Sequence, residues 1–419
     1  MMASESVSVL RVSLSSRPVG YLAGYRGGRN VMVFDESFRG DPDRPTLTLS
    51  SHPASPRAAH VLGSPWIRQQ RLHPWLSNLL PEGALREWLA QGLKVHPDNE
   101  FPLLAQLGHD LPGAIEAEPV QPDEVPEHVL VHRTSITPVV RSLAPARGFS
   151  LAGVQMKFSM REREGRFHFG HEDALGNWIV KTPSTRHRGV PANEFTAMTL
   201  AQAAGVDIPE IRMVNLSALE GLPDIALPQE PWAYAIRRYD RDGEARVHAE
   251  DMAQVLFQYP HEKYSGANYE QVGKLLRDYT QDGLAAVQQF ARRLLVNVLL
   301  ANGDAHLKNW SLLYPDRINP VLSPAYDIVF TRAWIADEQE MALNLHGNKR
   351  WYRIGWADFE AWARAIGTPW PAIRVVLEDT LGRARERWPD LLAQSPMLPE
   401  QKAQLRRHWR ELQPEWRIG

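Results

Sequence analysis

The spacing of apolar side chains changes along the chain and divides it into strand-like and helical regions. In the first 115 residues, several segments alternate apolar and polar positions, which is typical of strands. These segments are 7–14, 31–34 and 46–50. Residues 76–89 and 101–107 then follow a helical spacing, with Pro81 compatible with a first turn. The pattern predicts a small β-rich unit that is completed by helices.

A second β-rich segment, residues 149–239, combines strand-like runs with one helix. The runs 166–169 and 178–182 flank a turn that contains Gly176 and Asn177, which predicts a hairpin. Residues 193–204 have helical spacing and end before Gly205, a residue suited to a helix C-terminus. Helices dominate after residue 248. The expected helices are 251–258, 269–279, 284–301, 356–365, 373–388 and 399–412.

The order of these regions predicts the domain organisation. Residues 117–147 are rich in proline, glutamate and valine and have little periodicity, which is typical of a connector. We expect an α+β chain with four parts: an N-terminal subdomain (1–115), a connector (116–148), a β-rich lobe (149–242) and a helical lobe (243–419). A β-rich lobe followed by a helical lobe is the order of the two-lobed protein-kinase fold.

Composition and charge exclude several classes of protein. A net charge of −2 gives no bulk attraction to nucleic acid, so DNA binding would need a local patch or a partner. The absence of cysteine excludes disulfides and thiolate metal sites and fits a reducing cytoplasm. The N-terminus lacks a secretory pattern, and the longest apolar run, near 294–301, is far shorter than the roughly 20 residues that span a bilayer. We therefore expect a cytoplasmic protein with no membrane segment.

The most informative chemistry follows that apolar run. Residues 302–309 read Asn-Gly-Asp-Ala-His-Leu-Lys-Asn, and a further carboxylate, Asp327, follows in the segment 324–328. A carboxylate, an amide five positions later and a second carboxylate are the polar groups that phosphoryl transfer requires. In a kinase the first, here Asp304, accepts the proton of the substrate hydroxyl. The other two, here Asn309 and Asp327, hold magnesium.

A kinase site also needs a cation on the phosphates of ATP, paired with an anion on a neighbouring element. Lys181 lies in the apolar strand 178–182, and Glu194 lies near the start of the helix 193–204, on the same face as Met198. A strand-to-helix ion pair is one interpretation. The other is that Lys181 ends an edge strand and Glu194 only favours the helix N-terminus. Together with the residues at 304–327, the ion pair is the favoured interpretation.

Two further residues of the octet have alternative roles. His306 could be a metal ligand, but no second histidine lies nearby at ligand spacing, so a structural role in bracing the loop is favoured. Lys308 could neutralise the phosphate in transfer or be a solvated loop lysine. The segment 150–157 contains only Gly153, a weak signal for a phosphate loop, although it precedes Lys181 by about one hairpin. Without the downstream site, an ordinary turn would be the better interpretation.

As a set, these segments resemble the HipA family, the Ser/Thr kinase toxins of bacterial toxin-antitoxin systems. The resemblance lies in residues 76–83, 149–157, 179–183, 193–195, 235–241, 250–252, 302–309 and 325–328. It implies an ATP- and Mg²⁺-dependent protein kinase with Asp304 as catalytic base and Asn309 and Asp327 as magnesium ligands. The implied ATP-binding residues are Ala152, Gly153, Val154, Gln155, Met156, Lys157, Lys181, Arg237, Arg238, Tyr239, His306, Lys308, Asn309 and Asp327, with Arg237 to Tyr239 as the adenine hinge.

The resemblance also implies regulation and partners. Ser150 matches the serine that the family autophosphorylates, and a phosphate there should repel ATP and switch the kinase off. The implied partner is a HipB-type helix-turn-helix antitoxin, through which the kinase reaches operator DNA. The implied substrate is an aminoacyl-tRNA synthetase, with glutamyl-tRNA synthetase as the first candidate, so that translation stalls and growth arrest or persistence follows.

Two features depart from the family pattern, and two other functions compete with it. Arg237 stands where the family often has an acidic hinge residue, and the Trp-rich C-terminal half shows no obvious match. A small-molecule kinase of the aminoglycoside-phosphotransferase type has a similar loop, but Asn302 stands where its histidine would be. A catalytically weak interaction module in an operon-repressing complex is the third alternative. Its signature would be loss of Lys181, Asp304 or Asp327, and all three are present.

Overall fold

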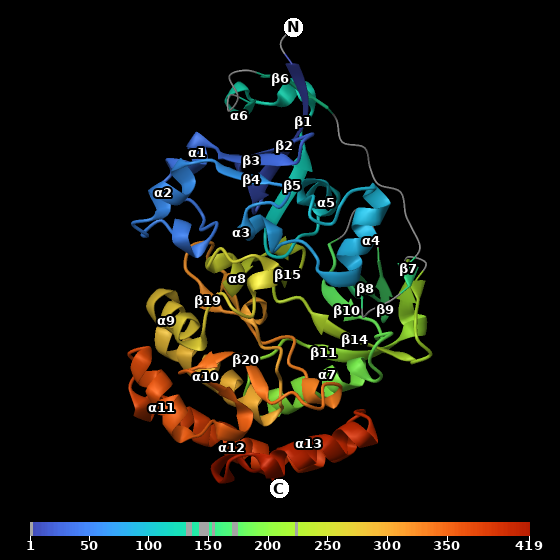
Figure 1. Cartoon of the computed structure of the whole chain (residues 1–419), viewed down its shortest axis with the longest axis vertical. Helices are drawn as coiled ribbons and strands as arrows, with labels where there is room; N and C mark the ends of the chain where they lie inside the picture. The colour runs from blue at the N-terminus through green and yellow to red at the C-terminus, as the bar shows by residue number, and fades with distance from the viewer. Residues whose placement is uncertain (1–2, 131–135, 142–150, 153–155, 170–174, 223–224) are drawn as a thin grey trace. The chain divides into compact units, whose positions relative to one another are not determined.

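The computed structural model describes residues 3–130, 136–141, 151–152, 156–169, 175–222 and 225–419 (Figure 1). The chain forms two compact units. Unit 1 contains residues 1–151, 240–260 and 313–320, and unit 2 contains residues 152–239, 261–312 and 321–419. The described residues form a mixed α+β structure that is β-rich at the N-terminus and helical at the C-terminus, as predicted.

Unit 1 is built on a sheet with strand order β4-β3-β2-β1-β5, in which β6 pairs in parallel with β1. The strands are β1 (Ala3–Leu14), β2 (Arg17–Tyr25), β3 (Arg29–Phe34), β4 (Trp66–Gln69), β5 (Ile115–Pro119) and β6 (Ile136–Val140). Alternate residues of β1 enter different cores, Leu10 and Val12 on one face and Val7 and Val9 on the other. Both faces of this strand are therefore buried, as period-two patterning allows.

Short helices and strand pairs complete unit 1. Its helices are α1 (Glu36–Arg39), α2 (Ala58–Gly63), α3 (Pro74–Ser77), α4 (Gly83–Leu93), α5 (Glu100–Leu107), α6 (Glu127–Leu130) and α8 (Met252–Val255). The further strands are β15 (Arg241–Asp242), β16 (Ala245–Arg246) and β17 (His248–Asp251). The longest of these helices, α4, ends at Lys94 in the left-handed conformation, a common way to stop a helix.

Unit 2 contains a second sheet, with strand order β11-β14-β10-β8-β9-β12. Its strands are β8 (Lys157–Arg163), β9 (Arg166–His168), β10 (Trp178–Lys181), β11 (Ile211–Asn215), β12 (Leu219–Glu220) and β14 (Trp232–Arg237). A separate pair joins β7 (Leu151–Ala152) to β13 (Ile225–Ala226). Helix α7 (Val190–Ala203) packs against β11 and β14.

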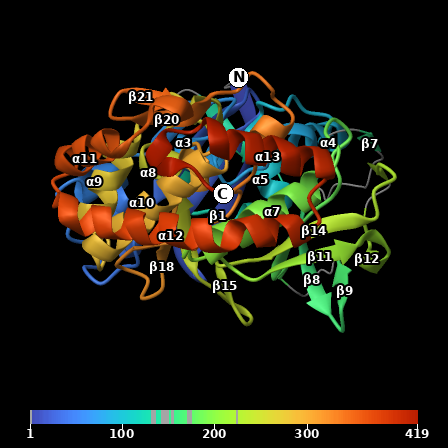
Figure 2. The same cartoon turned by 90° about the horizontal axis from the view of Figure 1, so that it is seen from below.

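The helical part of unit 2 surrounds the long, buried helix α10 (Gly283–Leu299). The other helices are α9 (Tyr269–Tyr279), α11 (Trp356–Ala365), α12 (Trp370–Gln394) and α13 (Pro399–Glu411). The short strands of unit 2 are β19 (Val321–Leu322), β20 (Glu340–Leu345) and β21 (Asn348–Arg350), and β18 (Ser311–Tyr314) begins in unit 2 and ends in the unit 1 segment 313–320. Helix α12 runs across both α10 and α7 (Figure 2).

Tryptophan and histidine side chains of the C-terminal helices hold the end of α10. Trp409 Nε1 donates to the carbonyl of Leu299 at 3.0 Å, and His408 Nε2 hydrogen-bonds the carbonyl of Val298 at 2.8 Å. Carbonyls in the last turn of a helix lack hydrogen-bond donors within the helix, and the side chains of Trp409 and His408 provide these donors. Part of the Trp-rich half of the chain therefore fixes the point at which the octet 302–309 begins.

Four elements differ from the sequence prediction for identifiable reasons. Residues 46–50 form no strand, because their backbone groups hydrogen-bond to single, separate groups rather than to a neighbouring strand. Leu49 N, for example, donates to Glu250 Oε1 at 2.8 Å. The predicted hairpin between 166–169 and 178–182 is wrong: β8 lies between β9 and β10, and the tight turn is at Glu164 and Gly165, both with positive φ. The helix expected at 76–89 is interrupted at 78–82, which includes Pro81. The helix at 251–258 ends before Phe257, whose φ is +52°.

Glu250 gives unit 1 a titrating group in its core. Its carboxylate accepts bonds from Leu49 N, Trp75 Nε1 and Tyr314 Oη, and burial raises the pKa of Glu250 to about 7 against these donors. A carboxyl whose folded pKa is raised keeps its full stabilising effect below the unfolded pKa of about 4.5 and loses it as pH rises towards 7. We expect the folded state to lose about 3 kcal/mol from this group between pH 4.5 and pH 8.

Urea unfolding midpoints at pH 5 and pH 8 measure this effect. The Glu250→Gln variant should show a smaller fall in midpoint with rising pH than the unmodified chain. An identical fall in both proteins would show that Glu250 is not the group that titrates.

Candidate active site

The octet 302–309 leaves α10 as a loop that is fixed by its own asparagines. Asn302 is buried, and its Nδ2 donates to Asn297 Oδ1 at 2.9 Å while its Oδ1 accepts from Asp304 N at 3.1 Å. Ala301, just before it, has a φ of +46°, which turns the chain out of the helix. The side chain of Asp304 remains 48% exposed at the tip of this turn. Asn302 therefore positions the backbone of Asp304 relative to α10.

Side chains from distant segments brace the rest of the loop. Thr331 Oγ1 accepts from Gly303 N at 2.8 Å, donates to the carbonyl of Ala301 and contacts Glu338. The carbonyl of Ala305 accepts from Tyr269 Oη at 2.9 Å and from Trp310 Nε1 at 3.2 Å. A loop whose backbone groups are satisfied in this way is held in one conformation, as a catalytic loop must be.

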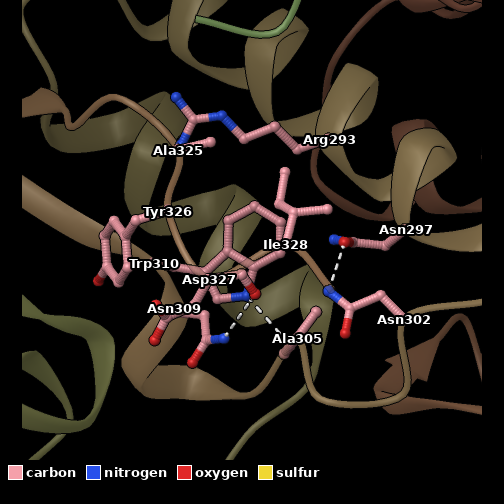
Figure 3. A pocket seen from close by; sticks show the side chains of 10 residues that line it. All are labelled: Arg293, Asn297, Asn302, Ala305, Asn309, Trp310, Ala325, Tyr326, Asp327 and Ile328. Carbon is pink, nitrogen blue, oxygen red and sulfur yellow. Dashed lines mark hydrogen bonds between the residues drawn. The ribbon is translucent and has the colours of Figure 1, made fainter. Parts of the chain in front are cut away.

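The segment 324–328 lies beside this loop. Asn309 Nδ2 lies 3.5 Å from the carbonyl of Asp327, and Tyr326 Oη donates to the carbonyl of Lys308 at 2.8 Å. Both segments line a small pocket, in which the side chains of Asn309 and Asp327 lie close together (Figure 3). The backbone of Asp327 has a φ of +55°, a conformation that costs free energy in a residue other than glycine and is enriched at functional sites.

Two lysines from the sheet converge on Asp327. Lys181 on β10 and Lys157 on β8 are directly opposite each other in the strand register. Lys181 Nζ is paired with Glu194 Oε1 of α7 at 2.5 Å and with Asp327 Oδ1, and Lys157 Nζ lies 3.1 Å from Asp327 Oδ2. Like charges opposite each other repel, so this arrangement requires an anion between them, and Asp327 supplies it.

The charges of this cluster are fixed by their neighbours. Burial raises the pKa of Asp327, but Lys157 and Lys181 outweigh it and hold that pKa far below its usual range. Burial also lowers the pKa of Lys181, yet Asp327 and Glu194 raise it above its ordinary value. Burial raises the pKa of Glu194, with Lys181 opposing. Lys181 and Asp327 therefore stay charged at neutral pH.

The residues of the candidate hinge differ in their surroundings. Arg237 is exposed and its guanidinium lies 3.6 Å from Glu210, whereas Arg238 is buried and donates to Ser159 Oγ at 2.8 Å. The ring of Tyr239 stacks on that of Tyr326, with 5.4 Å between centroids. Arg237 therefore directs its charge to the surface, and Tyr239 joins the hinge to the segment that carries Asp327.

The candidate phosphate loop is described only at its ends. Met156 is buried and its backbone exchanges hydrogen bonds with Thr182, next to Lys181. Lys157 begins β8, and Ala152 belongs to β7. Ser150, Gly153, Val154 and Gln155 lie outside the described residues.

His306 and Lys308 both belong to the catalytic loop 302–309. His306 is buried, and its Nε2 lies 3.9 Å from Asp304 Oδ1. Its ring meets the ring of Tyr264 edge to face, with 5.0 Å between centroids. The carbonyl of Lys308 accepts a hydrogen bond from Tyr326 Oη. The His306 side chain is thus buried beneath its own loop, in contact with Tyr264.

The oxygen donors at Asn309 and Asp327 fit magnesium better than a transition metal. Within the described residues, no group of three or more His, Cys, Asp or Glu side chains could hold a metal ion. Magnesium does not need such a group, because it is bound through one or two carboxylates together with substrate phosphates and water. Asp327, with its low pKa, is available as the carboxylate.

Sequence reasoning missed several residues that shape this site. Asn297, Tyr264, Thr331 and Tyr326 bond the loop or Asp304, but their partners lie up to 40 positions away in the sequence. Only Asn297 carried a signal, as a polar residue within an otherwise apolar run. Separately, no helix among the described residues combines the length and apolar character needed to cross a membrane.

Comparisons with known proteins show the family. The model of the HipA-like C-terminal domain matches residues 149–388, and the model of the HipA N-terminal domain matches residues 10–118. The inferred kinase Y4dM of Sinorhizobium fredii is 42% identical over 348 residues, 82% of each chain. The serine/threonine-protein kinase toxin HipA of Shewanella oneidensis is 26% identical over 377 residues, 80% of this chain and 81% of that one.

A solved structure shows the same fold. The Shewanella oneidensis MR-1 toxin-antitoxin complex of HipA, HipB and operator DNA contains a chain that superposes with a TM-score of 0.70 at 20% identity, covering 94% of this chain and 93% of that one. This superposition shows the fold, and the family models and the relatives show the family and the enzyme class. The chain belongs to the HipA family, and it is an ATP-using serine/threonine-protein kinase of the kind that acts as the toxin in toxin-antitoxin systems.

Proposed function

We propose that the cluster around Asp304 and Asp327 transfers the γ-phosphoryl group of ATP to a serine or threonine hydroxyl of a protein. The observation that carries this proposal is the convergence of Lys181, Asp327 and Asn309 beside the braced loop of Asp304 within unit 2. These are the groups that phosphoryl transfer uses, and they come from three separate segments of the chain, 178–181, 302–309 and 324–328.

The residues divide the reaction between them. Asp304 accepts the proton of the acceptor hydroxyl, whose oxygen forms a bond to the γ-phosphorus while the bond to the ADP oxygen breaks. Lys181 and Lys157 hold the phosphates through their charge, and Glu194 keeps Lys181 in place. Asn309 and Asp327 would hold Mg²⁺, which neutralises charge on the phosphates when bound. The backbone of residues 237–239 would hold adenine.

The 150–157 segment would cover the phosphates and carry the regulatory serine. A phosphate on Ser150 adds nearly two negative charges next to the phosphates of ATP, so it should weaken ATP binding and end the activity. The position of Lys157 at Asp327 supports this placement of the segment, because it is the residue where the segment joins β8.

Self-phosphorylation is the experiment that tests the proposed function. Purified chain with Mg²⁺-ATP should gain one phosphoryl group within residues 149–160, located by peptide mass spectrometry, and then lose activity. Ser150→Ala should keep its activity and stay unmodified there, and Asp304→Ala should gain nothing. A chain that binds no nucleotide and gains no phosphate would contradict the kinase assignment, whereas a phosphate elsewhere would contradict only the role of Ser150.

We propose a HipB-type helix-turn-helix antitoxin as the partner and an aminoacyl-tRNA synthetase as the substrate. The family membership and the fold shared with the Shewanella HipA chain support the antitoxin. A net charge of −2 supports contact with operator DNA mainly through that antitoxin. Glutamyl-tRNA synthetase is the first candidate substrate, and its phosphorylation would inhibit translation and arrest growth.

A further inference from the structure

A tyrosine of the same unit occupies the proton-accepting side of Asp304. Tyr264 Oη donates to Asp304 Oδ1 at 2.5 Å. Tyr264 is 46% exposed, and the Asp304 side chain is 48% exposed, so the contact lies where a substrate would approach. A hydrogen bond to an ionised carboxylate is charge-assisted and stronger than one between neutral groups.

The loop that carries Tyr264 is attached to the catalytic loop. The carbonyl of Lys263 accepts from Leu307 N at 3.1 Å, and Ser265 N and Gly266 N close a turn onto the carbonyl of Glu262. The Tyr264 ring packs edge-on against His306 and lies 5.6 Å from the Lys263 ammonium. The backbone on both sides of Tyr264 is therefore fixed, while its side chain remains half-exposed.

The hydroxyl of Tyr264 lies within the hydrogen-bond distance of Asp304 that an acceptor hydroxyl would need. A general base works only on a hydroxyl within hydrogen-bond distance, about 2.6–3.2 Å, and Tyr264 already uses that position on Oδ1. We propose that Tyr264 is an acceptor gate: its hydroxyl holds the place of the substrate hydroxyl on Asp304 and leaves when a serine- or threonine-bearing protein segment enters.

The gate explains how the site could discriminate between acceptors. A protein segment has binding energy from residues around its hydroxyl and can displace Tyr264, whereas a single water molecule has none. Tyr264 therefore suppresses transfer of the γ-phosphoryl group to water and favours protein acceptors. This inference rests on the proposed role of Asp304 as the base.

Tyr264→Phe tests the gate because it removes the hydroxyl and keeps the ring that packs on His306. The probe is water: in chains that also carry Ser150→Ala, so that self-phosphorylation does not end the activity, Mg²⁺-ATP hydrolysis without any added protein acceptor should rise about tenfold, as expected when a hydrogen bond to a charged group no longer competes. The KM for ATP should stay unchanged, because Tyr264 contacts the acceptor side of the site. Tyr279→Phe, at an exposed tyrosine at the end of α9, is the matched control and should change nothing.

Each other outcome has a distinct meaning. A lower rate of hydrolysis in Tyr264→Phe would show that the hydroxyl positions Asp304 and would overturn the gate, and an unchanged rate would overturn it as well. In both cases normal self-phosphorylation by the unmodified chain would leave the kinase assignment standing. The rise in ATP hydrolysis must also vanish in the double variant Tyr264→Phe/Asp304→Asn. A rise that persists there would not depend on Asp304 as the base.

Discussion

Replacing Asp304 with asparagine is expected to lower kcat for phosphoryl transfer by about 10²–10⁴, the contribution of a positioned general base. The amide has the shape of the carboxylate but accepts no proton from the acceptor hydroxyl. Its Oδ1 can still accept the bonds that the carboxylate makes in this structure, including the bond from Tyr264. Because Asp304 is not part of the Lys181 cluster, the KM for ATP should stay within about threefold. Steady-state kinetics with labelled ATP measures both constants.

An exposed carboxylate of the same unit provides the control. Asp337→Asn removes one negative charge at an exposed position and should leave both constants unchanged. An Asp304→Asn variant with the kcat of the unmodified chain would mean that another group takes the proton, and it would remove Asp304 from the mechanism.

Replacing Lys181 with methionine is expected to have the largest effect on stability. Lys181 and Glu194 have only 4% and 2% of their side chains exposed, and the substitution leaves the Glu194 carboxylate buried without its cation. Breaking a buried pair from one side typically costs about 3–5 kcal/mol, so the free energy of unfolding should fall by about that amount. ATP affinity should fall as well, because a cation on the phosphates is lost. Urea unfolding and equilibrium ATP binding measure the two effects.

A double variant separates the two effects. Glu194→Gln in the Lys181→Met background removes the stranded charge, so most of the lost stability should return while ATP affinity stays low. Asp327 keeps Lys157 in both variants. If the double variant were as unstable as the single one, the buried pair would not be the source of the stability loss.

Local sequence patterns carry more information about the residues of this cluster than about the strands around it. Asp304, Asn309 and the apolar run before them are close in the sequence, so their spacing defines a loop that follows a buried helix. The place of Lys181 and Glu194 also follows from local patterns, since one ends a strand and the other lies in the N-terminal part of a helix. The contact of Lys181 with Asp327, 146 positions away, becomes visible only in the folded unit.

The errors arose where tertiary contacts override local spacing. The hairpin was misplaced because the strongest turn signal near it, Gly176-Asn177, joins strands that do not pair, whereas Glu164-Gly165 forms the tight turn. Residues 46–50 alternate like a strand, yet their buried backbone bonds Glu250 and other single groups. Tyr264 carried no sequence signal at all, because a tyrosine in a loop gains meaning only from the carboxylate beside it.

Transfer of labelled γ-phosphate to a protein acceptor tests the central claim most directly. The purified Ser150→Ala chain is incubated with Mg²⁺ and γ-labelled ATP in the presence of a panel of aminoacyl-tRNA synthetases, glutamyl-tRNA synthetase first, with Asp304→Asn in parallel. We predict label on a serine or threonine of one synthetase with the first protein and none with the second. Label in both, or no label and no ATP binding by either, would contradict the assignment of this cluster as the phosphoryl-transfer site.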